Sequence, residues 1–314
     1  MKDVILHEVG PRDGLQVEKT VVPTEQKARW IEALIDARID VVQIGSFVHP
    51  DKVPQMADTD ALFSRFTAPG SPPRKTILSG LVLNERGLAR GLACGVELYC
   101  MGVSASETHS RKNVGLSIGE ATRRIVATAL EAVAAGKPVQ VSVQSAFGCG
   151  FEGPIAEQRV LAIARAYVDA GLLRISLADT AGHAHPDQVS RLYEKLFALS
   201  PDIETACHFH DTYGLGMANI FAALRAGVTS VESSFGGLGG CPFTKLAAGN
   251  VATEDFVHAL QRMGRRQDVD LEKLIALARD VSAFFARDLP GRVQSAGAIP
   301  VSGETISARQ EVPA

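Results

Sequence analysis

Residues 206–250 read ACHFHDTYGLGMANIFAALRAGVTSVESSFGGLGGCPFTKLAAGN, and this stretch decides which fold the chain can adopt. It begins with a strand-like run that ends at His208 and His210. A helical pattern follows, and a second strand-like run covers residues 228–234. Strand, helix and strand in this order form a βαβ unit, whose two strands run parallel in one sheet. The stretch therefore predicts a parallel α/β fold.

The same unit recurs along most of the chain. Eight short runs are rich in apolar and β-branched residues, and patterns with helical spacing separate them. The runs cover residues 4–9, 41–45, 76–83, 96–103, 139–145, 173–178, 204–210 and 228–234. Eight alternating strands and helices in about 235 residues are typical of a closed (β/α)₈ barrel, or TIM barrel. The alternative is an open doubly wound sheet, which a dinucleotide-binding fingerprint after the first strand would favour, and none is found there.

The chain continues beyond the eighth unit with a short helical extension. We expect one helix from Thr253 and another over 271–285, so that the barrel domain with its C-terminal helices spans residues 1–285. Residues 286–314 are rich in Gly, Pro, Ser and Ala, and we expect an extended or partly disordered tail. Earlier in the chain, Ser117 and Glu120 form a capping-box pattern that predicts the start of a long helix.

The composition excludes several classes of protein. Of the 314 residues, 46% are hydrophobic and 21% charged, which is ordinary for a globular protein. The formal charge of -3 and the absence of a basic cluster argue against nucleic acid as a partner. No apolar run reaches the ~18 residues of a membrane span, and the N-terminus lacks a signal-peptide pattern. Five cysteines, a small and odd number, do not suggest a disulfide framework, so we expect a cytoplasmic protein.

Four residues are candidate metal ligands. His208 and His210 are two apart at the end of a predicted strand, so their side chains leave the same face. Asp13 follows the first strand and offers a carboxylate, and Asn250 offers an amide oxygen. This mixture of nitrogen and hard oxygen favours octahedral Mg²⁺ or Mn²⁺, while Zn²⁺ remains an alternative.

Two further positions bear on this site. In such barrels the active site lies at the carboxyl ends of the strands, where Arg12 is placed to bind an anionic or carbonyl group of a substrate. His183 and His185 form a rival histidine pair with the same spacing. They lie before Pro186, which suits the first turn of a helix, so a loop or capping role is favoured over metal binding.

Cys241 is the candidate catalytic thiol. A single cysteine is more often a small buried hydrophobe than a catalyst. This one follows four glycines within six residues and precedes Pro242, a composition typical of a mobile loop rather than a core. The other four cysteines are expected to be buried: Cys94, Cys100, Cys149 and Cys207.

Four motifs together resemble the hydroxymethylglutaryl-CoA lyase family. The resemblance extends from the first strand to about residue 259 and belongs to a broader group of metal-dependent lyases and Claisen synthases. The motifs are EVGPRDGLQ at 8–16, SFV at 46–48 with VPQM at 53–56, SASE at 104–107, and GLGGCP at 237–242.

The resemblance implies a (β/α)₈ barrel that cleaves 3-hydroxy-3-methylglutaryl-CoA to acetoacetate and acetyl-CoA with a divalent metal. It implies metal ligands at Asp13, His208, His210 and Asn250, and Cys241 as the catalytic thiol on a closing loop. Arg12 would contact the substrate carbonyl or carboxyl group, and the base would be His208 or Asp13. The expected partner is a small acyl-CoA substrate, and the expected assembly is a homo-oligomer.

Gln43 departs from the family, which usually has an acidic residue at the end of the second strand. We expect Gln43 to contact the substrate, and the change leaves the acyl group open: a related 3-hydroxyacyl-CoA such as citramalyl-CoA is the alternative. Residues 243–245 (FTK) also differ from the family's usual Tyr-Ala. Other readings are a Claisen-type synthase, an aldolase for a free keto acid, and an acyl-CoA-binding barrel without turnover.

Overall fold

The computed structural model describes residues 4–240 and 249–299, and within these residues the eight predicted strands close into a barrel. All neighbouring strands are parallel, and β1 pairs with β8 to close the ring, as Ile5 opposite Ser230 shows. The predicted (β/α)₈ fold is therefore confirmed. The strands are β1 (Ile5–Glu8), β2 (Val41–Ser46), β3 (Ile77–Leu81), β4 (Leu98–Ser104), β5 (Val139–Gln144), β6 (Arg174–Asp179), β7 (Glu204–Phe209) and β8 (Ser230–Ser233).

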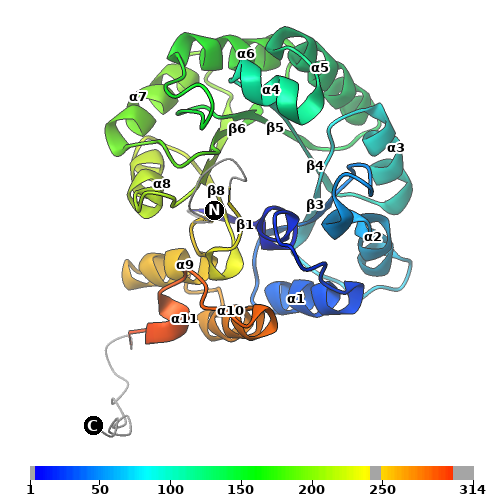
Figure 1. The fold of residues 1–314 in the computed structure, drawn as a ribbon, viewed down its shortest axis with the longest axis vertical. Helices are drawn as coiled ribbons and strands as arrows, with labels where there is room; N and C mark the ends of the chain where they lie inside the picture. The colour runs from blue at the N-terminus through cyan, green and yellow to red at the C-terminus, as the bar shows by residue number, and fades with distance from the viewer. Residues whose placement is uncertain (1–3, 241–248, 300–314) are drawn as a thin grey trace, which may run out of the picture.

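Helices surround the barrel as a ring, which Figure 1 shows end-on. The helix starts follow local sequence signals: Ser117 and Glu120 make the predicted capping box, and Pro186 lies in the first turn of its helix. The ring consists of α1 (Thr24–Asp36), α2 (Thr59–Thr67), α3 (Glu85–Cys94), α5 (Ile118–Ala134), α6 (Glu157–Asp169), α7 (Pro186–Phe197), α8 (Gly216–Arg225) and α9 (Thr253–Arg262). Further elements are α4 (Glu107–Val114), α10 (Leu271–Phe285), α11 (Val293–Ala296) and the short turns η1 (Gly10–Gly14), η2 (Pro54–Met56) and η3 (Phe235–Gly237).

The strands separate an apolar layer from a polar one. Successive side chains of a strand point to opposite faces. On β5, the fully buried Val141 and Val143 therefore belong to the core between barrel and helices, whereas Gln140, Ser142 and Gln144 face the barrel interior and line a cavity. The barrel interior is therefore polar on this strand and contains part of the cavity.

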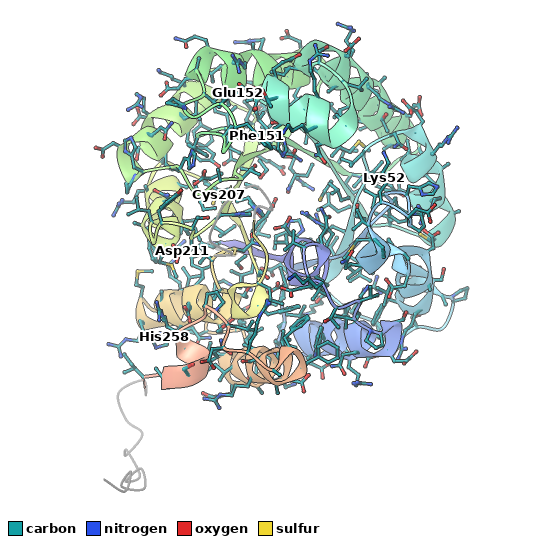
Figure 2. All side chains as sticks on the ribbon, in the orientation of Figure 1. Lys52, Phe151, Glu152, Cys207, Asp211 and His258 are labelled. Carbon is teal, nitrogen blue, oxygen red and sulfur yellow. The ribbon has the colours of Figure 1, made fainter. Side chains whose placement is uncertain are left out.

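Two additions to the ring shape its surroundings. The short helix α4 lies inside the ring of Figure 1, and Glu152 from the β5–α6 loop holds its start by accepting bonds from Ser106 Oγ and Thr108 N (Figures 1 and 2). On the opposite side, α10 packs between α1 and α9. The first part of the predicted tail contains α11 and buries Leu289 and Val293.

No helix in the described part of the chain is long and apolar enough to cross a membrane.

Candidate active site

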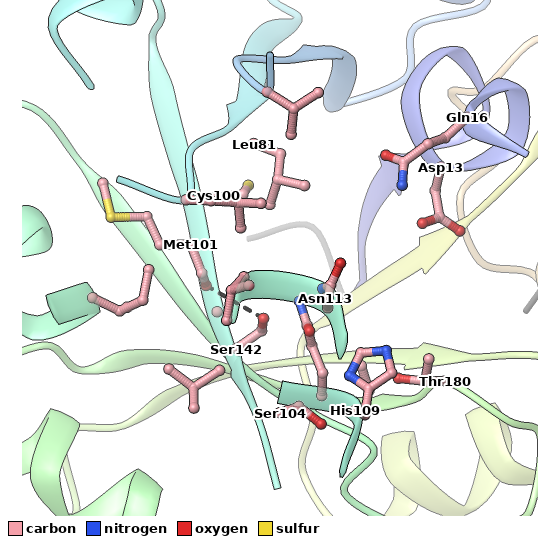
Figure 3. Close-up of a pocket in the computed structure, with 18 of the residues that line it drawn as sticks. Asp13, Gln16, Leu81, Cys100, Met101, Ser104, His109, Asn113, Ser142 and Thr180 are labelled. Atoms are coloured by element: carbon pink, nitrogen blue, oxygen red, sulfur yellow. Dashed lines mark hydrogen bonds between the residues drawn. The ribbon is translucent and has the colours of Figure 1, made fainter. Parts of the chain in front are cut away.

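A cavity of about 590 Å³ opens at the carboxyl ends of the strands and extends into the polar barrel interior. Five residues predicted to form the site line it together: Arg12, Asp13, Gln43, His208 and His210. Figure 3 shows Asp13 and Gln16, from the η1 region, across the cavity from Asn113 and His109 of α4. The first strand, its following turn and the seventh strand thus bring polar groups to one place, as the barrel topology predicts.

The cluster of Asp13, His208 and His210 could hold a metal ion. Their ligand atoms lie within 4.8 Å of one another, and they form the one such cluster of His, Cys, Asp and Glu within residues 4–240 and 249–299. The Nε2 atoms of the two imidazoles are 3.0 Å apart, so at least one of them lacks a proton. Asp13 Oδ2 lies 3.9 Å from His208 Nε2 and 3.7 Å from His210 Nε2.

Asn250 joins this cluster through a β-bridge that pairs it with His210. Its Nδ2 atom donates to Asp13 Oδ2 and to Leu238 O, both at 2.9 Å. Its Oδ1 atom is buried and has no hydrogen-bond partner among the described residues. The structure therefore brings together all four predicted metal ligands, two of which are more than 230 positions apart in sequence.

The charges around the cluster favour a negative Asp13. Burial opposes its ionisation, but Arg12 beside it and the hydrogen bond with His210 hold the pKa of Asp13 well below its usual range. Arg12 Nη1 donates to Asp13 Oδ1, and Arg12 Nε donates to Gln43 Oε1. Gln43 thus lies next to Arg12 as a neutral acceptor, and it is almost completely buried.

Glu232 is a site residue that the sequence did not reveal. It lies on β8 inside the barrel, and its Oε2 is 2.9 Å from His208 Nδ1. Its Oε1 accepts bonds from Gln140 Nε2 at 2.7 Å and Ser176 Oγ at 3.3 Å. Burial alone would raise the pKa of Glu232, but the bond to His208 and neighbouring positive charges lower it to about 2.

The contact with Glu232 fixes the orientation of His208. Because the carboxylate is ionised, Nδ1 of His208 donates a proton to it, and Nε2 faces Asp13 and His210. Burial would lower the pKa of His208, but Glu232 and Asp13 outweigh it and raise that pKa. An alternating strand pattern could have placed Glu232 inside the barrel, since it is two residues from the inward-facing Ser230.

The remaining predicted residues are placed as follows. Cys241 lies outside the described residues, whereas Gly240 before it lines the cavity. Cys100, Cys149 and Cys207 are buried, as predicted, although Cys100 also lines the cavity and Cys94 is only half-buried (Figures 2 and 3).

The rival histidine pair is used differently. His185 precedes α7 as its N-cap residue, and the backbone N–H of His183 donates to the buried carboxylate of Asp179. The His183 ring packs near Tyr213, with ring centroids 5.9 Å apart. Within the described residues, neither histidine belongs to a group of potential metal ligands, in agreement with a loop role, and the side chain of His185 makes no capping hydrogen bond.

Comparisons with known proteins show the family of the chain. Residues 3–281 match the family model described as HMGL-like. A hydroxymethylglutaryl-CoA lyase of Bacillus subtilis is 38% identical over 292 residues, which are 93% of this chain and 96% of the relative. An (R)-citramalyl-CoA lyase of Chloroflexus aurantiacus is 37% identical over 313 residues, which are 98% of each. The solved structure of an HMG-CoA lyase from Acinetobacter baumannii, in complex with coenzyme A and 3-methylmalate, matches with a TM-score of 0.88 at 33% identity, covering 99% of this chain and 98% of that one. The chain belongs to the HMGL-like family.

Proposed function

We propose that this protein is a divalent-metal-dependent carbon–carbon lyase that cleaves 3-hydroxy-3-methylglutaryl-CoA to acetoacetate and acetyl-CoA. The observation that carries the proposal is the convergence of Asp13, His208 and His210, with Arg12 beside them, on one cavity of an HMGL-like barrel. The hydroxymethylglutaryl-CoA lyases among its relatives support the choice of substrate.

Asp13, His208, His210 and Asn250 would hold the metal ion. Two neutral nitrogens, a carboxylate and an amide oxygen suit Mg²⁺ or Mn²⁺, and Zn²⁺ is the alternative. The unpartnered, buried Oδ1 of Asn250 and the Nε2 atom of His208, which faces Asp13, are the kind of atoms that a cation stabilises. When bound, the ion would lower the pKa of the substrate hydroxyl group and polarise its oxygen.

Arg12, a base and Cys241 would carry out the remaining steps of the reaction. Arg12 donates to the substrate carbonyl or carboxyl oxygen and orients it. Asp13 accepts the proton of the tertiary hydroxyl, because Nδ1 of His208 already donates to Glu232 and its Nε2 is a proposed ligand. The C2–C3 electron pair then moves to the thioester carbonyl as the enolate of acetyl-CoA. Cys241 donates a proton to C2 of that enolate, which completes acetyl-CoA and leaves the keto acid.

The cavity has the features that an acyl-CoA requires. Its inner part is lined by hydroxyl and amide groups, including Ser142, Gln144 and Ser176, and its outer part by α4 and Lys52. The related structure that contains coenzyme A supports this choice of ligand class. A homo-oligomeric assembly and a cytoplasmic location complete the proposal.

The experiment that tests metal dependence uses the unmodified protein. Treatment with a chelator should abolish release of acetyl-CoA from 3-hydroxy-3-methylglutaryl-CoA, and Mg²⁺ or Mn²⁺ should restore it. Stripping with the chelator, removing it by gel filtration and adding back each ion separately identifies the preferred one. Full activity in excess chelator would contradict the proposed metal.

A second candidate substrate is citramalyl-CoA. Two observations favour it: a neutral Gln43 beside Arg12, and the (R)-citramalyl-CoA lyase that matches along almost the whole chain. The carboxylate of citramalyl-CoA is attached directly to the carbon that bears the hydroxyl group. Its negative charge would therefore lie at a different distance from Arg12 than the charge of 3-hydroxy-3-methylglutaryl-CoA.

Gln43→Glu tests whether this position selects the substrate. A glutamate would form an ion pair with Arg12 and change the charge presented to the acyl group. We expect the ratio of kcat/KM between 3-hydroxy-3-methylglutaryl-CoA and citramalyl-CoA to change by ~1 kcal/mol or more, about fivefold. Parallel assays of both substrates with each protein give this ratio. If both values scale equally, Gln43 only adjusts the rate, and 3-hydroxy-3-methylglutaryl-CoA is favoured.

A further inference from the structure

Two buried carboxylates, Glu8 and Glu254, lie against the turn η3 and take no part in the site described above. Glu8 is the last residue of β1, and Glu254 lies in the first turn of α9; both have an exposed fraction of 0%. Burying a carboxylate is costly unless hydrogen bonds replace its hydration. The hydrogen-bond donors that these two side chains meet therefore indicate their role in the structure.

The two carboxylates hold consecutive backbone N–H groups of η3. Glu8 Oε1 accepts a bond from Phe235 N at 3.0 Å, and Glu254 Oε2 accepts one from Gly236 N at 3.0 Å. The other oxygen of Glu8 accepts a 2.6 Å bond from Thr253 Oγ1, which orients the carboxylate. We call Glu8 and Glu254 the carboxylate clamp.

The segment that the clamp holds lies directly against two proposed metal ligands. Leu238 O accepts the bond from Asn250 Nδ2. Gly239, with φ of +114°, lies so close to these ligands that a side chain there would collide with Asn250 Nδ2 and contact Asp13 Oδ2. Gly240 then reaches the cavity. The contacts therefore run without a break from the clamp, through residues 235–240, to the ligands.

Residues 235–240 need such external support because four of the six are glycines with positive φ. Glycine has more conformational freedom to lose on folding than any other residue. Hydrogen bonds from rigid neighbours, here a strand and a helix, restrict that freedom where packing side chains are missing.

We propose that the carboxylate clamp positions residues 235–240 against Asp13 and Asn250, so that Glu8 and Glu254 are positioning residues for the metal centre. The inference rests on the proposed function, since it takes these two ligands to bind the ion. It adds two residues that contact neither the proposed ligands nor the cavity.

The charge of the clamp agrees with this role and adds a pH dependence. Burial raises the pKa of Glu8 to about 7 and that of Glu254 to about 8, and Asp255 and Glu8 contribute to the latter. Two charged groups thus act on Glu254: Asp255 from its own helix and Glu8 from β1, both acidic. The turn η3 and the nearby Gly291 carry no charged side chain.

The sign follows from these shifts. The usual value for a glutamate is 4.5, so the unfolded chain releases these protons at a lower pH than the folded protein does. Below pH 4.5 the two protonated carboxyl groups contribute fully to the stability of the folded protein. This contribution is lost as the pH rises through about 7 for Glu8 and about 8 for Glu254. Ionisation of both carboxylates places two like charges in one buried region, which destabilises the folded protein.

The test measures Mn²⁺ binding by calorimetry on the full-length protein. Glu254→Leu removes the acceptor for Gly236 N and should weaken Mn²⁺ binding by ~10-fold, as loss of an outer supporting residue does. Glu254→Gln retains an acceptor oxygen and should restore the affinity to near the wild-type value. Asp255→Ala is the matched control, because Asp255 also accepts bonds from backbone N–H groups, but those of Arg292 and Val293. It should lower Tm and leave Mn²⁺ affinity unchanged.

Each result decides a different point. A folded Glu254→Leu protein that binds Mn²⁺ like the wild type overturns the clamp, whereas a wild-type protein that binds no Mn²⁺ overturns the proposed function. If Glu254→Leu does not fold, Thr253→Val takes its place, because it removes the donor that orients Glu8, and wild-type Mn²⁺ affinity in this variant overturns the clamp. Between pH 7 and 9 the Tm of the wild type should fall further than that of Glu254→Gln, and equal falls would overturn the clamp.

Discussion

Replacing His208 with alanine is expected to abolish cleavage and to weaken Mn²⁺ binding by more than the ~10- to 100-fold that loss of a supporting outer residue costs. The substitution removes the Nε2 atom that faces His210 and Asp13 and leaves an incomplete ligand set. Calorimetric titration with Mn²⁺ measures the affinity, and circular dichroism establishes that the variant is folded.

Glu232→Gln is the matched comparison, because Glu232 touches the same imidazole from the other side. An amide keeps the shape but removes the charge that holds the Nδ1 proton, so the ligand atom remains and its orientation weakens. We expect a loss of ~10-fold in Mn²⁺ affinity, clearly smaller than that of His208→Ala. Wild-type Mn²⁺ affinity in folded His208→Ala would contradict the proposed ligand set.

The second large effect is expected for Cys241→Ser. Serine keeps the size of cysteine, but its hydroxyl has a far higher pKa than a thiol, so proton donation to the enolate should slow. Loss of a general acid typically costs ~10²- to 10⁴-fold in rate. We expect kcat to fall by this amount, while Mn²⁺ affinity is unchanged because Cys241 is not among the proposed ligands. Steady-state kinetics and Mn²⁺ titration of the same preparation separate the two quantities.

Cys94→Ser controls for the loss of a thiol as such. Cys94 ends α3, is half-buried and has a pKa raised by burial to about 11, so it is a poor proton donor. It does not line the cavity, and its replacement should leave kcat unchanged. If Cys241→Ser turns over at the same rate as Cys94→Ser, Cys241 is not the proton donor.

The barrel could be predicted because its signals are local and repeated. Each strand is a short apolar run, and the helices that follow begin at recognisable residues such as Ser117 and Pro186. The places of α4 over the cavity and of α10 between α1 and α9 could not be predicted, since they depend on packing between residues far apart in sequence. The same is true of residues 286–299, in which Leu289 and Val293 are buried.

The candidate site could be predicted in part for a related reason. His208 and His210 share a strand face, and Asp13 follows a strand, so topology alone places them at one rim. Glu232 and Glu254 lie outside the quoted motifs, and Glu8 begins one of them without a role assigned to it; a charged residue in a strand or helix is more often exposed. Their roles depend on which atoms they meet: the imidazole of His208 for Glu232, and backbone N–H groups of η3 for the clamp.

The identification of products tests the central claim most directly. Purified protein with Mg²⁺ is incubated with a panel of 3-hydroxyacyl-CoAs, and the thioester and acid products are separated and quantified. The proposed activity predicts equimolar acetyl-CoA and acetoacetate from 3-hydroxy-3-methylglutaryl-CoA, with both products absent when the metal is removed. Recovery of every thioester intact from a folded protein that binds Mn²⁺ would contradict it and leave an acyl-CoA-binding barrel without turnover.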